Sequence, residues 1–147
     1  MREEYTTQRM KIAKQFHWEM GHRLPFHDAG CANIHGHSYA MWVELEGTCD
    51  ENGMLLDYGI MKERINPVIK ELDHAFICDE SDEVMKPFLA GTDFKAVYVP
   101  FTTTAEHIAE YMLAKVWDAL KEFANIDRIS LRLQETTNSY AEVSQSR

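Results

Sequence analysis

The sequence predicts an α+β fold in which two helices cover one face of a four-stranded antiparallel sheet. Apolar and polar residues alternate near both ends of the chain, whereas apolar residues recur at helical spacing in the middle. The order of elements is therefore two strands, two helices and two strands, which suits a sheet with its helices on one side. At 147 residues the chain is long enough for a single domain, residues 1–147, with a sizeable core.

The first two strands are predicted over residues 11–22 and 35–47, and each includes histidine in its apolar row. In the first strand the row ends on His22 and contains Ile12, Phe16, Trp18 and Met20. In the second strand His35 and His37 begin a row that continues with Tyr39, Met41, Val43 and Leu45. Because side chains two apart in a strand share a face, the histidines are expected on the face that the core covers.

Two helices are predicted in the middle of the chain. The first covers residues 59–72, where apolar residues recur at helical spacing, and Pro67 predicts that it is kinked or begins late. The second covers about residues 104–123, and Thr103 with Glu106 matches a capping box at its start. Both helices are expected to bury their apolar faces against the sheet.

The segment between the helices gives weaker signals, and two further strands follow the second helix. Residues 79–83 form an acidic run that predicts a solvated loop, and residues 94–99 predict a short strand. The next strand has an apolar row that leads to Glu135 and consists of Ile129, Leu131 and Leu133. A last short strand is predicted over about residues 140–143.

The composition argues against several classes of protein. With 15 Lys and Arg against 24 Asp and Glu, the formal charge is −9, and no basic cluster forms a nucleic-acid footprint. No apolar stretch is long enough to cross a membrane, and the first residues lack the apolar core of a signal peptide. Three widely spaced cysteines do not form a disulfide framework. We therefore expect a cytoplasmic protein with free thiols and with no nucleic-acid or membrane partner.

The stretch from His22 to His37 predicts a metal site. His35 and His37 share a face in an extended strand, and His22 comes from the preceding strand. Three imidazoles that leave one position open are a usual ligand set of catalytic zinc. If Cys31 supplied a fourth ligand, the site would instead be closed and structural. The spacing favours the open site and leaves the closed one as the alternative.

Glu135 extends an apolar row on the face of the sheet that the helices are predicted to cover. A buried carboxylate is costly unless a donor or a cation pairs with it, and the same holds for a cluster of imidazoles. Glu135 and the histidines both occur where the apolar rows end. A pocket is therefore expected to open at that point.

Six motifs are spread over nearly the whole chain: Gly21-His22-Arg23-Leu24-Pro25, Cys31-x-x-x-His35-Gly36-His37, Leu55-Leu56-Asp57-Tyr58, Leu72-Asp73-His74, Thr103-Thr104-Ala105-Glu106 and Glu135-Thr136-Thr137. Together they resemble the 6-pyruvoyltetrahydropterin synthase family, and most closely its bacterial branch, the 6-carboxy-5,6,7,8-tetrahydropterin synthases of the queuosine pathway. The gap of three residues between Cys31 and His35 is similar to that of the carboxy-forming branch. Arg23 is one candidate for a triphosphate contact, and a solvated side chain is the alternative.

The resemblance implies a tunnelling fold, or T fold, in which sheets from several subunits join into a barrel, commonly a homohexamer of two trimers with sites at subunit interfaces. It implies Zn²⁺ held by His22, His35 and His37. It also implies conversion of 7,8-dihydroneopterin triphosphate to 6-carboxytetrahydropterin with release of acetaldehyde and triphosphate. The alternatives are a pyruvoyl-forming or side-chain-cleaving relative with the same pocket and, outside the enzymes, a structural zinc-binding module.

The resemblance also assigns chemistry to individual residues. Cys31 would be the base that takes a proton from the substrate, and His74 its acid–base partner, with Asp73 orienting His74. Adjacent side chains on a helix do not face one another, so this pair requires an irregular helix end. The alternative for the pair is a helix C-terminus with a stabilising histidine.

The same resemblance implies residues that bind the pterin. Glu135 would anchor it, because a carboxylate accepts two hydrogen bonds from the ring N–H and the exocyclic amine. Three residues near the start of the second helix would also reach the pterin: Thr103, Thr104 and Glu106. For Thr103 and Glu106 the capping box is an equal alternative.

Overall fold

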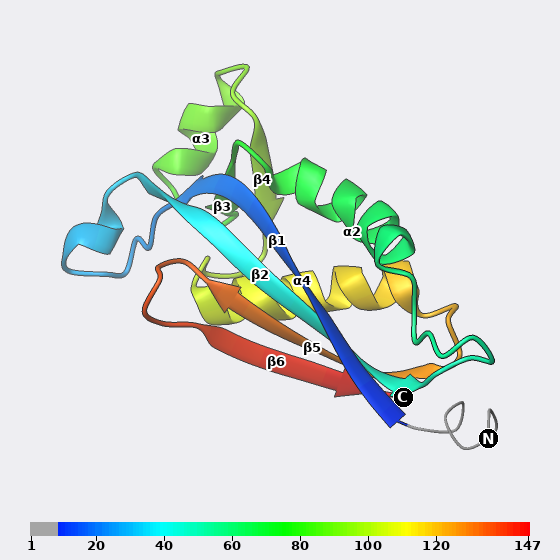
Figure 1. Ribbon diagram of the computed structural model, residues 1–147. Coiled ribbons are helices and arrows are strands. Elements are labelled where there is room, and N and C mark those ends of the chain that lie inside the picture. Colours follow the sequence, from blue (N-terminus) through cyan, green and yellow to red (C-terminus); the bar gives the residue numbers. More distant parts are fainter. Residues whose placement is uncertain (1–8) are drawn as a thin grey trace.

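A six-stranded sheet forms the body of the molecule in the computed structural model, which describes residues 9–147 (Figure 1). The strands stand in the order β4-β3-β1-β2-β5-β6. Along the chain they are β1 (Arg9–His22), β2 (His35–Thr48), β3 (Ala75–Asp79), β4 (Ala96–Val99), β5 (Ile126–Gln134) and β6 (Ala141–Ser146). Residues 1–8, for which the sequence predicts no signal peptide, lie outside the described residues.

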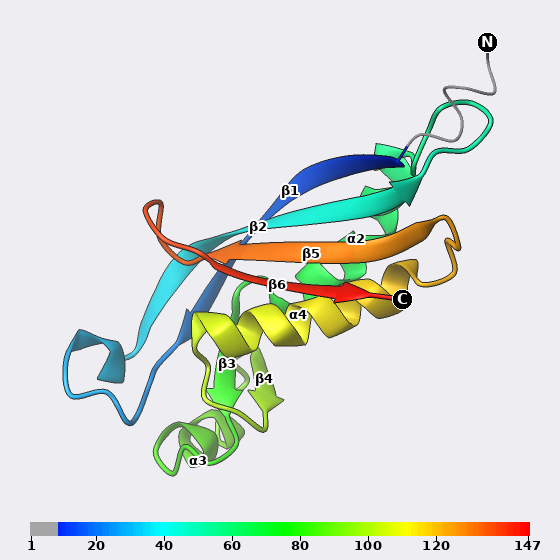
Figure 2. The ribbon, with the colours of Figure 1, turned by 90° about the horizontal axis from the view of Figure 1, so that it is seen from below.

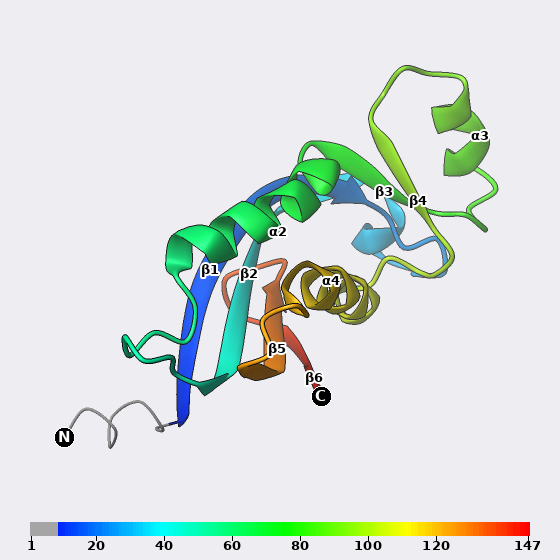
Figure 3. The same cartoon turned by 90° about the vertical axis from the view of Figure 1, so that its right-hand side faces the viewer.

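The helices of the described residues are η1 (Gly30–Ala32, a 3-10 turn), α2 (Tyr58–Leu72), α3 (Met85–Ala90) and α4 (Ala105–Leu120). The two long helices, α2 and α4, lie on the same face of the sheet and contact each other (Figure 3). α4 runs along β5 and β6, and α2 packs on β1 and β3 (Figure 2). The predicted α+β class is therefore confirmed. No helix in residues 9–147 has both the length and the apolar character needed to span a membrane.

The sheet has six strands instead of the four predicted, and the described residues contain helical segments beyond the two predicted helices. β1, β2, β5 and β6 are the four predicted antiparallel strands, but β3 and β4 extend the sheet and run parallel to β1 and to each other. β4 confirms the short strand predicted over residues 94–99. β3 and α3 were missed, because elements of five and six residues are too short for periodicity to distinguish them from a loop.

Apolar rows on β1, β2 and β5 face α2 and α4 and form the main core. Of the predicted members, Ile12 is half-buried at the margin of the core. Each of the others is at most 6% exposed: Phe16, Trp18, Met20, Tyr39, Met41, Val43, Leu45, Ile129, Leu131 and Leu133. Burying one such side chain contributes about 1.5–3 kcal/mol, and a slip of one residue would turn a whole row to the other face. The core therefore fixes the register of β1 and β2 up to their last pair, His22 and His35.

The sequence predicts that the first long helix is either kinked at Pro67 or begins late, and the structure shows that α2 begins at Tyr58. The Asp57 side chain caps it by accepting hydrogen bonds from the backbone N–H groups of Gly59 at 2.7 Å and Ile60 at 3.2 Å. Pro67 lies inside the helix rather than at its start. The prediction of a late start is therefore wrong.

The capping box predicted for α4 is also wrong. The residue that caps the helix is Thr104, whose hydroxyl accepts a hydrogen bond from the backbone N–H of His107 at 3.2 Å. Thr103 is completely buried, and its hydroxyl donates to the carbonyl of Arg23 at 3.2 Å. The cap is therefore one residue later than the box formed by Thr103 and Glu106 would place it.

The acidic run at residues 79–83 is not simply solvated. Asp79 is 7% exposed and accepts hydrogen bonds from the backbone N–H and hydroxyl of Ser81. Asp82 is 4% exposed and forms an ion pair with Arg23. The prediction failed because these two carboxylates have partners inside the protein, which offsets the cost of removing them from water.

Candidate metal centre

Three histidines meet at the end of the sheet where the η1 loop, the β5–β6 turn and the start of α4 lie together (Figures 1 and 2). His22 is the last residue of β1 and His35 the first of β2, and the two are paired in register. One ring nitrogen from each of these two histidines and from His37 lies within 4.8 Å of the others. The predicted convergence is confirmed, and the three histidines are positioned to hold a metal ion.

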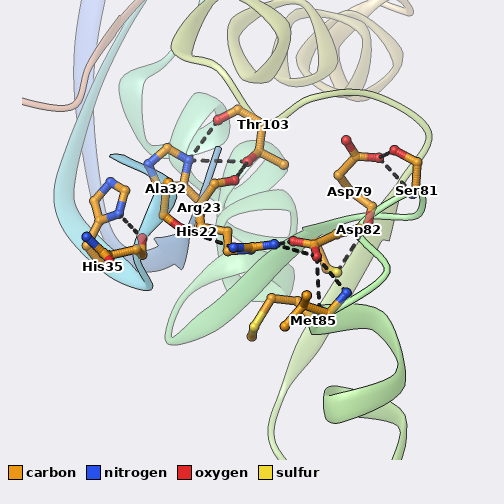
Figure 4. A network of polar contacts seen from close by, with 12 residues as sticks. His22, Arg23, Ala32, His35, Asp79, Ser81, Asp82, Met85 and Thr103 are labelled. Carbon is orange, nitrogen blue, oxygen red and sulfur yellow. Dashed lines mark hydrogen bonds and ion pairs between the residues drawn. The ribbon is translucent and has the colours of Figure 1, made fainter. Parts of the chain in front are cut away.

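Backbone carbonyls orient two of the three imidazoles (Figure 4). His22 Nδ1 lies 2.7 Å from the carbonyl oxygen of Thr103, and His35 Nδ1 lies 2.7 Å from that of Asn33. A carbonyl can only accept a hydrogen bond, so Nδ1 carries the proton in both rings. The lone pair of each ring is then on Nε2. Such an outer hydrogen bond is the usual companion of a metal-binding histidine.

The environment of His22 favours a bound cation. Its Nε2 is buried and has no hydrogen-bond partner among the described residues, although buried polar atoms nearly always have one. Burial is the main cause that lowers the pKa of His22 to about 4, and the neighbouring His35 and His37 contribute to the same shift. The ring is therefore neutral at physiological pH, which is the state that binds a metal. The donor set and this unpartnered nitrogen fit a metal ion.

Cys31 lies in η1, beside the histidines in sequence but outside their cluster. Among the described residues, the cluster of ligand atoms within 4.8 Å of one another consists of the three histidines and does not include the Cys31 sulfur. The Cys31 side chain is half-buried and its thiol is free. Its carbonyl accepts a hydrogen bond from the backbone N–H of Leu24 at 2.7 Å, which closes the loop. This placement gives no support to a closed site with Cys31 as fourth ligand.

Glu135 follows the last residue of β5 and points at the histidines. Its Oε1 lies 3.8 Å from Nε2 of His22, and its Oε2 lies 3.8 Å from Nε2 of His37. The apolar row on β5 thus leads to the cluster, as its parity indicated. Glu135 also lines a depression of about 210 Å³ together with Glu106 and Tyr140.

Tyr39 is a site residue that sequence reasoning missed. It is completely buried, its ring packs on His37 with centroids 5.6 Å apart, and its hydroxyl donates to Glu135 Oε1 at 3.3 Å. Trp18 on β1 stacks on the same ring with centroids 5.4 Å apart. Burial and the nearby Glu135 carboxylate raise the pKa of Tyr39 above its usual range, so the phenol keeps its proton. Its position two residues after His37 in the same row was the available signal.

The three residues near the start of α4 have different surroundings. Thr103 is buried, and its carbonyl and hydroxyl contact His22 and Arg23. Thr104 is half-buried and caps the helix. Glu106 is exposed and lines the depression that Glu135 lines. Of the three, Glu106 therefore shares an accessible surface with Glu135.

The side chains of Asp73 and His74 contact each other. From the sequence, this contact was expected only if the helix ended irregularly. Asp73 is the C-cap residue directly after α2, and His74 has a positive φ of 61°. This turn places His74 Nδ1 2.9 Å from Asp73 Oδ1. The same carboxylate accepts a hydrogen bond from the backbone N–H of Glu19 at 3.0 Å. That hydrogen bond, followed by the contact with His74, holds the pKa of Asp73 below its usual range.

His74 and Glu135 line different depressions. His74 borders an open hollow of about 330 Å³ with Glu19, Ser38 and His37, over the paired glycines of β1 and β2. The hollow lined by Glu135 does not include His74. Within one chain, the structure therefore does not bring the predicted acid–base pair and the predicted pterin anchor into one pocket.

Arg23 is neither solvated nor free to contact a triphosphate. Its guanidinium forms two hydrogen bonds with Asp82, from Nε at 2.7 Å and from Nη2 at 2.9 Å (Figure 4). Asp82 lies 59 residues further along the chain. No local sequence pattern relates the two residues, so sequence reasoning had no signal for this pair.

The chain resembles known proteins over nearly its whole length. The model of a family described as 6-pyruvoyl tetrahydropterin synthase matches residues 11–146. The 6-carboxy-5,6,7,8-tetrahydropterin synthase of Haemophilus influenzae is 36% identical over 140 residues, covering 90% of this chain and 96% of that protein. The protein of the same name from Rickettsia conorii is 30% identical, covering 91% and 99%.

Solved structures show the same fold at lower identity. The 6-pyruvoyl tetrahydropterin synthase of Plasmodium vivax superposes with a TM-score of 0.78 at 20% identity, over 95% of this chain and 99% of that one. The enzyme of the same name from Caenorhabditis elegans gives a TM-score of 0.70 at 21% identity, over 96% and 99%.

Proposed function

The chain belongs to the 6-pyruvoyl tetrahydropterin synthase family, and from this premise we propose that it is a zinc-dependent 6-carboxy-5,6,7,8-tetrahydropterin synthase. The reaction converts 7,8-dihydroneopterin triphosphate and water to 6-carboxytetrahydropterin, acetaldehyde and triphosphate, as a step of the queuosine pathway. The whole chain would act as one pterin synthase domain.

One observation supports the proposal most directly: a carboxylate stands beside three converging imidazoles. Glu135 lies 3.8 Å from two of them and is held by the Tyr39 hydroxyl. A metal-binding set and an acceptor for a planar donor edge are thereby adjacent, which a pterin with a reactive side chain requires. The identity with relatives named 6-carboxy-5,6,7,8-tetrahydropterin synthase favours the carboxy-type product.

Each residue then has a defined task. Zn²⁺ bound by the three histidines would supply Lewis acidity toward an oxygen of the substrate side chain. Glu135 accepts hydrogen bonds from the pterin ring N–H and exocyclic amine, and Glu106 lines the same depression. Cys31 removes a proton from the substrate side chain as thiolate, and His74, oriented by Asp73, exchanges a proton with it.

The separation of His74 from Glu135 favours a site shared between subunits. The two residues line different hollows in one chain, so a neighbouring subunit would supply the His74 pair. β4 and β6 are the edges of the sheet, and edges are where sheets of neighbouring subunits can join. We therefore include a barrel-forming homo-oligomer, a homohexamer of two trimers, in the proposal.

Product analysis tests the activity. The zinc-loaded protein is incubated with 7,8-dihydroneopterin triphosphate, and acetaldehyde and pterin products are quantified by derivatisation and mass spectrometry. Acetaldehyde in equal amount to 6-carboxytetrahydropterin is expected. Triphosphate release with a 6-pyruvoyl product and no acetaldehyde would assign the pyruvoyl-type reaction instead. Bound zinc without substrate consumption would contradict both and favour a structural zinc module.

Two variants make the test specific. His35→Ala removes a proposed ligand and should abolish product formation together with most zinc binding. His17→Ala is the matched control, because His17 is an exposed strand residue whose ring contacts Gln15 rather than the cluster. It should retain both properties.

A further inference from the structure

The pair of Arg23 and Asp82 joins two segments that are remote in sequence. Arg23 begins the loop that contains Cys31, and Asp82 precedes α3 in the β3–α3–β4 segment, residues 75–99. The guanidinium and the carboxylate meet side by side through two hydrogen bonds, the geometry that is most specific for this kind of pair. Among the residues that the structure describes, no other hydrogen bond joins residues 80–92 to the loop formed by residues 23–34.

Asp82 is held rigidly on its own side. Its side chain is 2% exposed, and Oδ1 also accepts hydrogen bonds from the backbone N–H groups of Val84 and Met85, each at 3.0 Å. The hydrogen bonds with Arg23, together with those from the backbone, hold the pKa of Asp82 below its usual range. The carboxylate is therefore charged at neutral pH and cannot turn away without losing several partners.

The β3–α3–β4 segment provides a base for Asp82 that is separate from the main core. Its apolar side chains form a small cluster of their own: Cys78, Met85 and Leu89, with Phe76 and Ala96 packed against it. β3 joins the sheet by pairing with the end of β1, at Met20 and Gly21. The segment is thus anchored to the strand that ends on His22.

Arg23 transmits this anchoring to the Cys31 loop. Its Nη1 donates a hydrogen bond to the carbonyl of Ala32 at 3.1 Å, directly after Cys31 (Figure 4). The next carbonyl, of Asn33, is the one that orients His35. On the backbone side, the Arg23 carbonyl accepts from Thr103, whose own carbonyl orients His22. The Nη1 group and the carbonyl of Arg23 thus contact the two segments that orient His35 and His22.

We propose that Arg23 and Asp82 are positioning residues for the reaction, and that the β3–α3–β4 segment serves to hold the Cys31 loop through them. The pair fixes the position of the Cys31 backbone relative to the three histidines. The role of Cys31 as base is part of the proposed function, and the inference about its positioning rests on that proposal. A displacement of about 1 Å at a reacting group can lower the rate by up to about a hundredfold.

The chain offers a second arginine–aspartate pair as a control. Arg9 and Asp127 also form two hydrogen bonds, from Nη1 at 2.7 Å and from Nη2 at 2.9 Å, on an exposed surface. Arg9 is at the opposite end of β1 from His22, so this pair does not contact the loop. A change at Asp127 therefore tests what the loss of such a contact does in itself.

The experiment compares Asp82→Asn and Arg23→Lys with Asp127→Asn, all zinc-loaded. Iodoacetamide alkylation of Cys31 is followed on its peptide by mass spectrometry, and hydrogen exchange is followed over residues 24–33. Neither measurement needs the substrate, so both remain valid if the proposed activity is absent. kcat and KM are then measured with 7,8-dihydroneopterin triphosphate where the wild type is active.

In Asp82→Asn and Arg23→Lys, alkylation of Cys31 should be about tenfold faster and the loop should exchange faster, because the loop opens more often. Zinc content should be retained, and kcat should fall about tenfold to a hundredfold with KM nearly unchanged. Asp127→Asn should match the wild type in all of these. Folded Asp82→Asn protein with wild-type loop reactivity and exchange would overturn the proposal, as would an equal effect in Asp127→Asn.

A further variant covers the case in which the single changes do not fold. Arg23→Met combined with Asp82→Asn leaves no unpaired charge and keeps an oxygen that can cap α3, so it should fold. It still lacks the donor to the Ala32 carbonyl. It should therefore show the fast alkylation of Cys31, and normal alkylation in this variant would overturn the proposal.

Discussion

The hydroxyl of Tyr39 donates a hydrogen bond to the carboxylate of Glu135, at 3.3 Å, from a position completely buried in the core. Glu135 directly follows β5, outside the ladder of the sheet. Tyr39 is fixed between Trp18 and His37. The buried phenol therefore holds the carboxylate beside the histidines.

Tyr39→Phe should weaken pterin binding without loss of zinc. The variant keeps the packing and removes only the donor, and a hydrogen bond to a charged group is worth about 1.5–3 kcal/mol. We expect an affinity about tenfold lower, measured by calorimetric titration of the zinc-loaded protein with a pterin. Tyr58→Phe is the control, since Tyr58 is 51% exposed. Equal affinities of the Tyr39 variant and the wild type would show that Glu135 needs no such support.

Glu135→Gln should weaken pterin binding more strongly. The amide keeps the shape but replaces one acceptor oxygen with a donor, which would face a donor of the pterin. The expected loss of affinity is about tenfold to a hundredfold in the same titration. Zinc occupancy, determined by elemental analysis, should be unchanged, because Glu135 is not proposed as a ligand. A folded variant that binds pterin normally would reduce Glu135 to a strand-end carboxylate.

Cys31→Ala should retain zinc and lose turnover. The thiol lies outside the histidine cluster, so its removal leaves the ligand set intact. Zinc per subunit and product formation are measured together, with His35→Ala as the comparison that loses both. A fall in zinc as large as in His35→Ala would make Cys31 a ligand and the site structural.

Acid should destabilise the metal-free protein through His22. Burial lowers the pKa of His22 to about 4 in the folded protein, whereas the pKa of a histidine in the unfolded chain is about 6.5. The unfolded state therefore binds more protons between these values, so the free energy of unfolding falls as the pH is lowered through that range. From about pH 7 to about pH 5 the contribution of His22 is about 2 kcal/mol, measured by urea unfolding. The His22→Gln variant should lack this contribution, and an identical pH dependence would contradict it.

The long periodic elements could be predicted from the sequence because each buries one continuous row. β1, β2 and β5 place their apolar residues as predicted, and the rows lead to His22, His37 and Glu135 because parity continues to the strand end. The convergence of the histidines followed from this regularity. It needed no knowledge of what packs above the sheet.

The parts that could not be predicted depend on contacts between distant residues. Arg23 and Asp82 are 59 positions apart, and neither has a neighbour that marks it as paired. If this contact is not known, the acidic run at residues 79–83 is expected to be solvated. β3 has five residues, too few for the periodicity of its sequence to distinguish it from a loop. Tyr39 was assigned to the core by its parity. The structure confirms that Tyr39 is buried, but its parity gave no indication of the hydrogen bond from its hydroxyl to Glu135.

The positive φ of His74 has a consequence for how the protein can be stabilised. A residue with a side chain gives up about 1–2 kcal/mol in this left-handed conformation, whereas glycine adopts it without steric cost. The fold therefore forgoes thermal stability at the position where the imidazole contacts Asp73, the pair proposed for acid–base chemistry. Directed evolution for heat resistance alone would be expected to replace His74 early, and if His74 has its proposed role, the gain in stability would be accompanied by a loss of activity.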